Sequence, residues 1–355
     1  MRIAFVIGSL GGGGAERVVA MLANKLVDMG HEVSIISIAS TDKTYYVSEH
    51  VKLLYCIKNY KVPGISFIRR VVDLKKTLQN YNPSVSVSFT VAVNIYSIFA
   101  SIGQKWRLII CERNDPKYDP QNKTLRILRR LTYNHADGYV FQTDRERDYF
   151  SEHIRSKSWV IPNPINSAIG LPFSGRRQKR FVTAVRLEPQ KNLKLAIDAF
   201  RVFHTSHNDY TFDIYGEGAL HDELQDYIDE KGLNKTVFLR GRSNTLYEDI
   251  NNSYAFILSS DYEGMSNSML EAMALGLPVI CTDYPSGGAR MVISDHINGI
   301  LIPVGDKESL IEAMRELADN EQMSREIGKR AEEIRQKLSV DQIMMLWEKC
   351  LFDLR

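Results

Sequence analysis

The chain has 355 residues, of which 44% are hydrophobic and 25% are charged. This length exceeds what one hydrophobic core usually organises, and the composition is that of a globular protein, so we expect two domains and exclude a disordered or fibrous chain. The net charge is only +2, and no helix-turn-helix, zinc-finger or RRM pattern occurs, which argues against a nucleic-acid partner.

Nothing in the sequence indicates secretion or a membrane span. The N-terminal run IAFVIG is too short for a secretory signal, and no apolar run approaches the roughly 20 residues that a spanning helix needs. The four cysteines lie far apart with no CxxC pair, so neither a zinc site nor a disulfide framework is indicated. We therefore expect a protein of the reducing cytoplasm.

The first half of the chain reads as one doubly wound domain. Apolar runs at 3–8 and 33–39 flank a glycine loop and a helix over 15–30, which is typical of a βαβ unit in a parallel sheet. Further strands are predicted at 84–89, 107–112 and 138–143. The prolines of WVIPNPI (159–165) predict a linker, so we place the first domain at 1–165.

The same alternation then starts again. Strands are predicted at 181–187, 211–218, 237–241, 255–260 and 278–282, with helices over 193–205 and 219–232 and a helical stretch from 307 onward. This pattern predicts a second domain over 166–339, followed by a last helix over 340–355. Two such Rossmann-like halves would face each other across a cleft at the carboxyl ends of their strands.

The glycine loop GSLGGGGAER is not a dinucleotide fingerprint. Its glycines fit G-x-G-x-x-G in no register, the second strand lacks the acidic residue that binds an adenosine ribose, and no Walker motif is present. Glycines still allow a backbone to approach a ligand closely, and the helix start near Ala15 would attract anions. The alternative is a tight turn without a ligand.

Basic residues are concentrated in the first half. Residues 1–165 contain 23 Lys and Arg against 14 Asp and Glu, a charge of +9, whereas the remainder contains 22 against 29, a charge of −7. In 67–76 and 122–131 cationic and apolar positions interleave at helical spacing. Such helices could lie on an anionic membrane or hold a lipid-phosphate acceptor, or they could simply be solvated faces.

The second half carries residues suited to a diphosphate and to sugar hydroxyls. Arg186 is predicted to close a strand, with Lys191 just before the next helix, so that both could converge on one anion, although each alone could be a surface cation. In EGMSNSMLEAMALGLPVI, Glu263 precedes a helix capped by Ser266 or Asn267 and ending at Gly276, and Glu271 lies in its first turns. Carboxylates accept hydrogen bonds from vicinal hydroxyls, although both could be surface acids.

The Glu-x7-Glu spacing of these two residues resembles the signature of the retaining GT-B glycosyltransferases of family four. The resemblance extends over nearly the whole chain, through GGGGAERV, IPNPI, VRLEPQKN, IYGEG and NGILIPVGD. CERNDP (111–116) and DYPSGGAR (283–290) are most similar to the branch that builds capsular polysaccharide and exopolysaccharide. The resemblance implies an α/β fold of two Rossmann-like domains, with the last helix crossing back to the first.

The resemblance also implies roles for particular residues. Arg186 and Lys191 would neutralise a nucleoside diphosphate, Glu271 would bind the ribose, and Glu263 would hold the donor sugar. The relatives' usual histidine is replaced by Glu112-Arg113-Asn114, which leaves Arg113 and Asn114 as candidates near the reacting carbon; alternatively, Arg113 pairs with Glu112 or Asp115. Further donor contacts would come from Gly13, Gly14, Arg240, Gly241, Gly264, Met265, Ser266, Asn267 and Ser268.

We therefore expect a sugar transferase that uses a UDP-sugar and an acceptor such as a polyprenyl-diphosphate-linked glycan at the inner face of the cell membrane. No Asp-x-Asp occurs, so we expect transfer without a metal ion or another cofactor. The alternatives are a nucleotide-sugar epimerase or a phosphorylase on the same fold, and a nucleotide-sugar sensor without turnover. The identity of the sugar, the acceptor linkage and the oligomeric state do not follow from the sequence.

Overall fold

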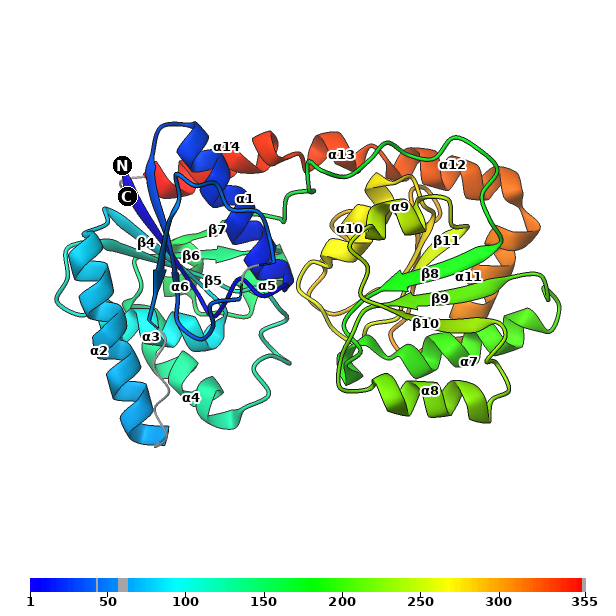
Figure 1. The fold of residues 1–355 in the computed structure, drawn as a ribbon, viewed down its shortest axis with the longest axis horizontal. Helices are drawn as coiled ribbons and strands as arrows, with labels where there is room; N and C mark the ends of the chain where they lie inside the picture. The colour runs from blue at the N-terminus through cyan, green and yellow to red at the C-terminus, as the bar shows by residue number, and fades with distance from the viewer. Residues whose placement is uncertain (43, 57–62, 353–355) are drawn as a thin grey trace. The chain divides into compact units, whose positions relative to one another are not determined.

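A computed structural model describes residues 1–42, 44–56 and 63–352. The chain divides into two compact units, which we call unit 1 (Met1–Pro164 with Val340–Arg355) and unit 2 (Ile165–Ser339). Each unit is built on one parallel β-sheet covered by helices, as Figure 1 shows. The predicted α/β class with two parallel sheets is therefore confirmed.

Unit 1 contains a seven-stranded sheet in the order β3-β2-β1-β4-β5-β6-β7. Its register pairs Ile3 with Val33 on one side and with Val85 on the other, so the strand order reverses beside β1. The elements are β1 (Arg2–Ile7), α1 (Gly14–Asp28), β2 (Glu32–Ser37), β3 (Lys52–Tyr55), α2 (Pro63–Tyr81), β4 (Val85–Phe89), α3 (Val91–Ser101), β5 (Arg107–Cys111), α4 (Lys123–Thr132), η1 (Tyr133–His135), β6 (Gly138–Phe141), α5 (Asp144–Asp148), α6 (Glu152–Ser156), β7 (Ser158–Val160) and α14 (Val340–Phe352).

Alternating side chains of β1 fill the two faces of this sheet. Ala4 and Val6 pack in a cluster with residues of α2 and α3, whereas Phe5 points the other way and lies 6.1 Å from Phe89 between ring centroids. Trp347 of α14 is buried and lies 6.2 Å from Phe89. The C-terminal helix therefore completes the core of unit 1.

Polar contacts also fix α14 on unit 1. Arg107 donates through Nη2 to the carbonyl oxygen of Cys350 at 2.8 Å, and Lys25 of α1 pairs with Asp341 at 2.6 Å. The hydrogen bond and the charge of Asp341 raise the pKa of Lys25. Residues 353–355 of the expected last segment lie outside the described residues.

Unit 2 contains a six-stranded sheet in the order β10-β9-β8-β11-β12-β13. Helices α7, α8 and α11 contribute to a large apolar cluster on one face, and α9 and α10 lie on the other (Figure 1). The elements are β8 (Arg180–Ala184), η2 (Pro189–Lys191), α7 (Leu193–His204), β9 (Thr211–Tyr215), α8 (His221–Glu230), β10 (Val237–Gly241), α9 (Leu246–Asn251), β11 (Ala255–Leu258), α10 (Asn267–Ala274), β12 (Val279–Thr282), β13 (Ile300–Ile302), α11 (Lys307–Asp319), α12 (Glu321–Ala331) and α13 (Ile334–Lys337).

Several details differ from the sequence-based expectation. The predicted linker over 159–165 was wrong at its start, because Trp159 and Val160 belong to β7 and pair with Val140 and Phe141. The strand expected over 181–187 ends at Ala184. Strands β3 and β13 were not predicted. All four cysteines are free and buried, and none of the helices in the described part of the chain is long and apolar enough to span a membrane.

Candidate functional site

The loops that follow β8 and β11 are joined at the carboxyl edge of the unit 2 sheet. The two strands are adjacent and parallel, so their following loops leave the sheet at the same edge. The backbone N–H of Asp261 donates to the carbonyl oxygen of Gln190 at 2.9 Å, and the Gln190 side chain donates to the carbonyl oxygen of Tyr262 at 2.6 Å. Ser259 Oγ donates to the carbonyl oxygen of Lys191 at 2.9 Å. These bonds fix the backbone on which the candidate site is built.

Lys191 and Glu263 form a buried ion pair in this junction. The Lys191 ammonium group donates to Glu263 Oε1, and the two side chains are only 10% and 11% exposed. Ser260 Oγ donates to the same carboxylate oxygen at 2.7 Å, and Gln190 Nε2 lies 3.3 Å from the other. The cation and one of the two carboxylates selected from the sequence therefore contact each other directly.

Helix α10 begins at Asn267, four residues after Glu263. Ser266 is its N-cap, as one of the two predicted candidates, and its hydroxyl accepts a hydrogen bond from the backbone N–H of Met269 at 3.4 Å. The loop before the helix is held from the far side by Ser286, whose hydroxyl donates to the carbonyl oxygen of Gly264 at 3.0 Å. The positive end of the α10 dipole thus lies next to the Lys191–Glu263 pair.

Glu271 lies within α10 and is only 5% exposed. Its Oε1 accepts a hydrogen bond of 3.0 Å from the hydroxyl of Tyr247, a residue of α9 that the motif analysis did not select. The sequence carried no signal for this contact, because nothing in the spacing of Tyr247 and Glu271 indicates that α9 and α10 are neighbours.

Arg186 has a different environment from Lys191. It lies two residues beyond the end of β8, and its side chain is 66% exposed and pairs with Glu188 at 3.0 Å. In this structure the two predicted cations therefore take different carboxylate partners. Because an exposed arginine is held only weakly by such a pair, Arg186 can turn toward an incoming anion at little cost.

Arg240 and Gly241 lie at the end of β10. Arg240 Nε lies 3.0 Å from Asp213 Oδ2, and Arg240 Nη2 donates to Oδ1 at 3.1 Å, so the guanidinium is bound to a buried carboxylate of β9. Gly241 has φ of +66°, a conformation that favours glycine. Arg240 and Gly241 therefore shape the turn after β10.

The glycine loop of unit 1 has the predicted position between β1 and α1. Helix α1 begins at Gly14, and Gly13 is its N-cap. Gly12 has φ of +111°, which explains one glycine of the run. A side chain at Gly13 would meet the carboxylate of Glu16 at 2.1 Å.

The guanidinium of Arg113 lies against two aromatic rings of unit 1. Its Cζ lies 4.7 Å from the ring centroid of Phe89 and 5.9 Å from that of Trp347, and its Nη1 donates to Asn163 Oδ1 at 3.2 Å. Burial lowers the pKa of Arg113. Its Nε and Nη2 have no hydrogen-bond partner among the described residues, so the alternative in which Arg113 pairs with Glu112 or Asp115 was wrong. The side chain of Asn114 is engaged locally, where it accepts from the backbone N–H of Asp115 at 2.9 Å.

A buried polar network next to Arg113 was missed by the sequence analysis. The hydroxyl of Tyr133 donates to Glu112 Oε1 and accepts from Asn94 Nδ2 at 3.1 Å. Burial raises the pKa of Glu112 to about 7, and burial together with the charge of Glu112 raises the pKa of Glu146 well above its ordinary value. The position of Glu112 directly after an apolar strand was the only feature of the sequence that could have indicated this network.

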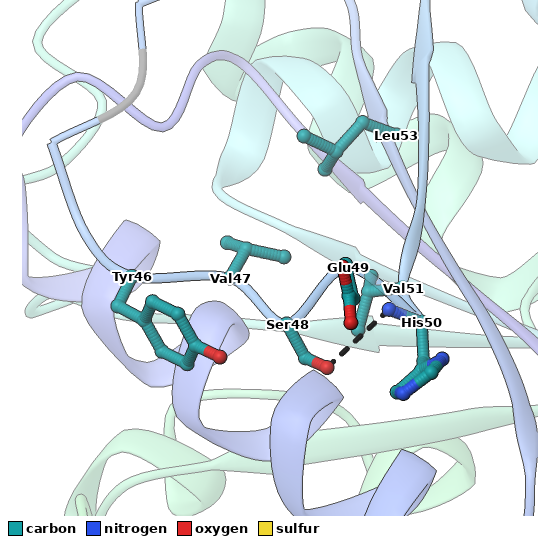
Figure 2. Close-up of a pocket in the computed structure, with 7 residues that line it drawn as sticks. All are labelled: Tyr46, Val47, Ser48, Glu49, His50, Val51 and Leu53. Atoms are coloured by element: carbon teal, nitrogen blue, oxygen red, sulfur yellow. Dashed lines mark hydrogen bonds between the residues drawn. The ribbon is translucent and has the colours of Figure 1, made fainter.

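A surface hollow of about 770 Å³ lies elsewhere, along the segment that leads into β3. Figure 2 shows its lining, in which Ser48 Oγ accepts from the backbone N–H of His50 at 3.3 Å. It is lined by Tyr46, Val47, Ser48, Glu49, His50, Val51 and Leu53. None of the site residues selected from the sequence borders it, so we assign it no part in the chemistry. Within the described residues, no three His, Cys, Asp or Glu side chains cluster in a way that could hold a metal ion.

Comparisons with known proteins identify the family. A family model described as Glycosyl transferases group 1 matches residues 173–334, and one described as Glycosyltransferase Family 4 matches residues 12–168. Over all of this chain and 99% of the relative, the sequence is 27% identical to the Campylobacter jejuni GalNAc-alpha-(1->4)-GalNAc-alpha-(1->3)-diNAcBac-PP-undecaprenol alpha-1,4-N-acetyl-D-galactosaminyltransferase.

Solved structures with the same architecture include two that cover essentially the whole chain. Sucrose-phosphate synthase from Thermosynechococcus elongatus superimposes with a TM-score of 0.85 at 16% identity, over 99% of this chain and 98% of that one. The Anabaena protein HepE in complex with UDP-glucose superimposes with a TM-score of 0.82 at 18% identity, over 100% of both chains. The chain is therefore a glycosyltransferase of family 4, with the GT-B fold.

Proposed function

We propose that this chain transfers a sugar, with retention of configuration, from a UDP-sugar to a glycan carried on polyprenyl diphosphate during the assembly of a bacterial surface polysaccharide. The Campylobacter jejuni relative, whose name gives an acceptor linked through a diphosphate to undecaprenol, supports this acceptor class. The HepE structure, which holds UDP-glucose, supports the donor class. The donor sugar is a hexose or an N-acetylhexosamine.

The observation that carries the proposal is the buried Lys191–Glu263 pair beside the start of α10. An ammonium group, a carboxylate and a helix N-terminus meet there, which suits a sugar diphosphate. The ammonium group and the helix N-terminus attract phosphate, and the carboxylate accepts hydrogen bonds from sugar hydroxyls. On donor binding the diphosphate would compete with Glu263 for Lys191, and Glu263 would turn to the hydroxyls. Glu271 would bind the ribose. The donor roles of Gly13, Gly14, Arg240 and Gly241 stay predictions.

The transfer needs little covalent help from the protein. The bond between the anomeric carbon and the donor phosphate oxygen breaks, an acceptor oxygen bonds to the same face of that carbon, and the acceptor proton passes to the departing diphosphate. Fixed positive groups that meet the charge on the leaving group are commonly the largest catalytic contribution. Lys191, Arg186 and the N-terminus of α10 would supply them, and we propose no metal ion because no Asp-x-Asp is present.

A membrane-facing surface is part of the proposal. Helices α2 and α4 both pack against α3, and each exposes two aliphatic side chains one turn apart: Ile68 and Val72 are 64% and 42% exposed, and Ile127 and Leu131 are 61% and 65% exposed. We call these four residues and the exposed basic residues of α2 and α4 the basic apolar face, which suits an anionic bilayer on the cytoplasmic side. Its exposed basic residues are Arg69, Lys76, Lys123, Arg126 and Arg130.

The test is to incubate the purified chain with radiolabelled UDP-sugars and polyprenyl-diphosphate-linked glycan, with and without EDTA. Transfer to lipid that survives EDTA and is lost in Glu263→Gln supports the proposal, and NMR of the product reports the anomeric configuration. An epimerised donor would instead identify an epimerase, and tight binding without product would identify a sensor. Transfer that is unchanged in Glu263→Gln would overturn the assignment of the donor pocket.

A further inference from the structure

A directed chain of hydrogen bonds ends on the carboxylate of Glu271. The backbone N–H of Ala168 donates to Asn166 Oδ1 at 3.0 Å, Asn166 Nδ2 donates to the hydroxyl oxygen of Tyr247 at 3.1 Å, and that hydroxyl donates to Glu271 Oε1 at 3.0 Å. All four residues belong to unit 2. We call this series of three hydrogen bonds the Asn166–Tyr247 relay.

The direction of the relay is fixed by its first member. A backbone N–H can only donate, so the carbonyl oxygen of the Asn166 amide faces Ala168 and its NH₂ group faces Tyr247. The oxygen of Tyr247 then accepts, and its single proton is left to donate to Glu271. The Glu271 carboxylate accepts this hydrogen bond through Oε1, which holds that oxygen toward Tyr247.

The fold holds Tyr247 in place for this contact. Tyr247 lies in the first turn of α9, which follows β10 through a turn in which the backbone N–H of Thr245 donates to Ser243 Oγ at 3.0 Å. Glu271 is only 5% exposed, so its carboxylate has few directions in which to rotate. The relay therefore selects one orientation of a nearly buried acid.

We infer that Tyr247 and Asn166 are positioning residues that orient the Glu271 carboxylate to accept hydrogen bonds from the vicinal hydroxyls of a ribose. This inference rests on the proposed function, because it assumes that Glu271 meets the nucleoside of the donor. It adds that discrimination between a ribonucleotide and a 2′-deoxyribonucleotide depends on the hydroxyl of Tyr247, which itself touches no substrate.

The test measures the dissociation constants of UDP and 2′-deoxy-UDP by calorimetry on the full chain. We expect wild type to bind UDP at least about tenfold more tightly, since a deoxyribose donates one hydrogen bond fewer to the buried Glu271 carboxylate. Tyr247→Phe should reduce this ratio about fivefold or more. The matched control is Tyr227→Phe, which removes a 2.8 Å hydrogen bond from a tyrosine to Asp198 elsewhere in unit 2 and should leave the ratio unchanged.

A second variant reverses the relay without removing the tyrosine. In Asn166→Asp the donor to Tyr247 is replaced by a carboxylate oxygen, so the tyrosine proton turns to position 166 and Glu271 loses it. This variant should show the same fall in the ratio of the two dissociation constants, and it tests the inference if Tyr247→Phe does not fold. A ratio that stays at the wild-type value in the folded variants overturns the inference while leaving UDP binding, and with it the proposed function, intact. A wild-type chain that binds neither nucleotide overturns the proposed function as well.

Discussion

Replacing Lys191 by methionine tests whether the buried pair in the candidate site stabilises unit 2. Methionine keeps most of the apolar stem of lysine and removes the ammonium group that donates to Glu263. The Glu263 carboxylate then stays at a position where only about a tenth of its surface reaches water. An ionised group in such a place without a counter-ion destabilises the folded state.

The magnitude follows from the burial and from the remaining partners. Breaking one side of a buried pair typically lowers the free energy of unfolding by about 3–5 kcal/mol. Ser260 and Gln190 still donate to the Glu263 carboxylate, which favours the lower end of that range, so we expect Lys191→Met to lose about 3 kcal/mol. The double variant Lys191→Met/Glu263→Gln should recover about 2 kcal/mol of this, because it leaves no buried charge.

The assay must report on unit 2. All three tryptophans, Trp106, Trp159 and Trp347, lie in unit 1, so tryptophan fluorescence does not follow the unfolding of the unit that contains the pair. Urea unfolding followed by hydrogen exchange of unit 2 peptides gives the free energy of unfolding for that unit by itself. The two units can unfold separately, so a single transition should not be assumed.

An exposed pair of the same type provides the control. Lys194 and Glu223 form an ion pair of 2.6 Å in unit 2, with side chains that are 45% and 56% exposed. Lys194→Met should change the free energy of unfolding by less than about 0.5 kcal/mol. If Lys191→Met unfolds as wild type does, the pair does not contribute to the stability of unit 2 and the reasoning from burial is refuted.

Three further predictions address other parts of the chain. Burial raises the pKa of Glu112 from 4.5 to about 7, so between these pH values the folded state keeps a proton that the unfolded state loses. The stability of unit 1 should therefore fall as pH rises from about 4.5 to 7. Glu112→Gln should reduce this fall by about 3 kcal/mol, as measured by unfolding followed with tryptophan fluorescence. Gly288→Ala places a methyl group 2.1 Å from a backbone oxygen of the Glu263 loop and should raise the KM for the donor, whereas Gly170→Ala, with open space around it, should not. Ile127→Glu with Leu131→Glu should abolish flotation with anionic vesicles.

Each of these predictions has an outcome that contradicts it. A stability profile of Glu112→Gln that runs parallel to wild type between about pH 4.5 and 7 would mean that another group titrates there. Wild-type donor kinetics in Gly288→Ala would mean that the loop can move without loss. The vesicle experiment is controlled by Met345→Glu, which changes an apolar residue that is 46% exposed on α14. An equal loss of flotation in that variant would mean that the basic apolar face has no special role.

The sheets could be predicted from the sequence where their strands are central, and were missed where the strands are short and at an edge. The apolar runs at 84–89, 107–112 and 138–143 appear as β4, β5 and β6, all in the interior of the unit 1 sheet. The three missed strands, β3, β7 and β13, contain three or four residues and each lies at the edge of its sheet. An edge strand needs fewer apolar residues, because one side has no neighbouring strand, so it leaves a weaker pattern.

The sequence named candidate residues for the site but did not show how their side chains would pair. Lys191 was selected for the diphosphate of the ligand and Glu263 for its sugar, and the structure joins the two residues in an ion pair across 72 residues of sequence. Sequence spacing could not show this, because the contact depends on β8 and β11 being neighbours in the sheet. Tyr247 was missed for the same reason, since a tyrosine in the first turn of a short helix resembles any other amphipathic surface residue.

The ion pair also bears on how a donor would be bound. A site that keeps its carboxylate neutralised before the substrate arrives avoids an unpaired buried charge, which would otherwise destabilise unit 2 by several kcal/mol. The diphosphate of a donor brings its own negative charge to Lys191, so the Glu263 carboxylate can be released only when sugar hydroxyls are present to replace the ammonium group. A nucleoside diphosphate without a sugar would leave Glu263 with Ser260 and Gln190 alone. Binding of the phosphates and binding of the sugar should therefore favour each other, and UDP-sugar should bind more tightly than UDP in wild type but not in Glu263→Gln.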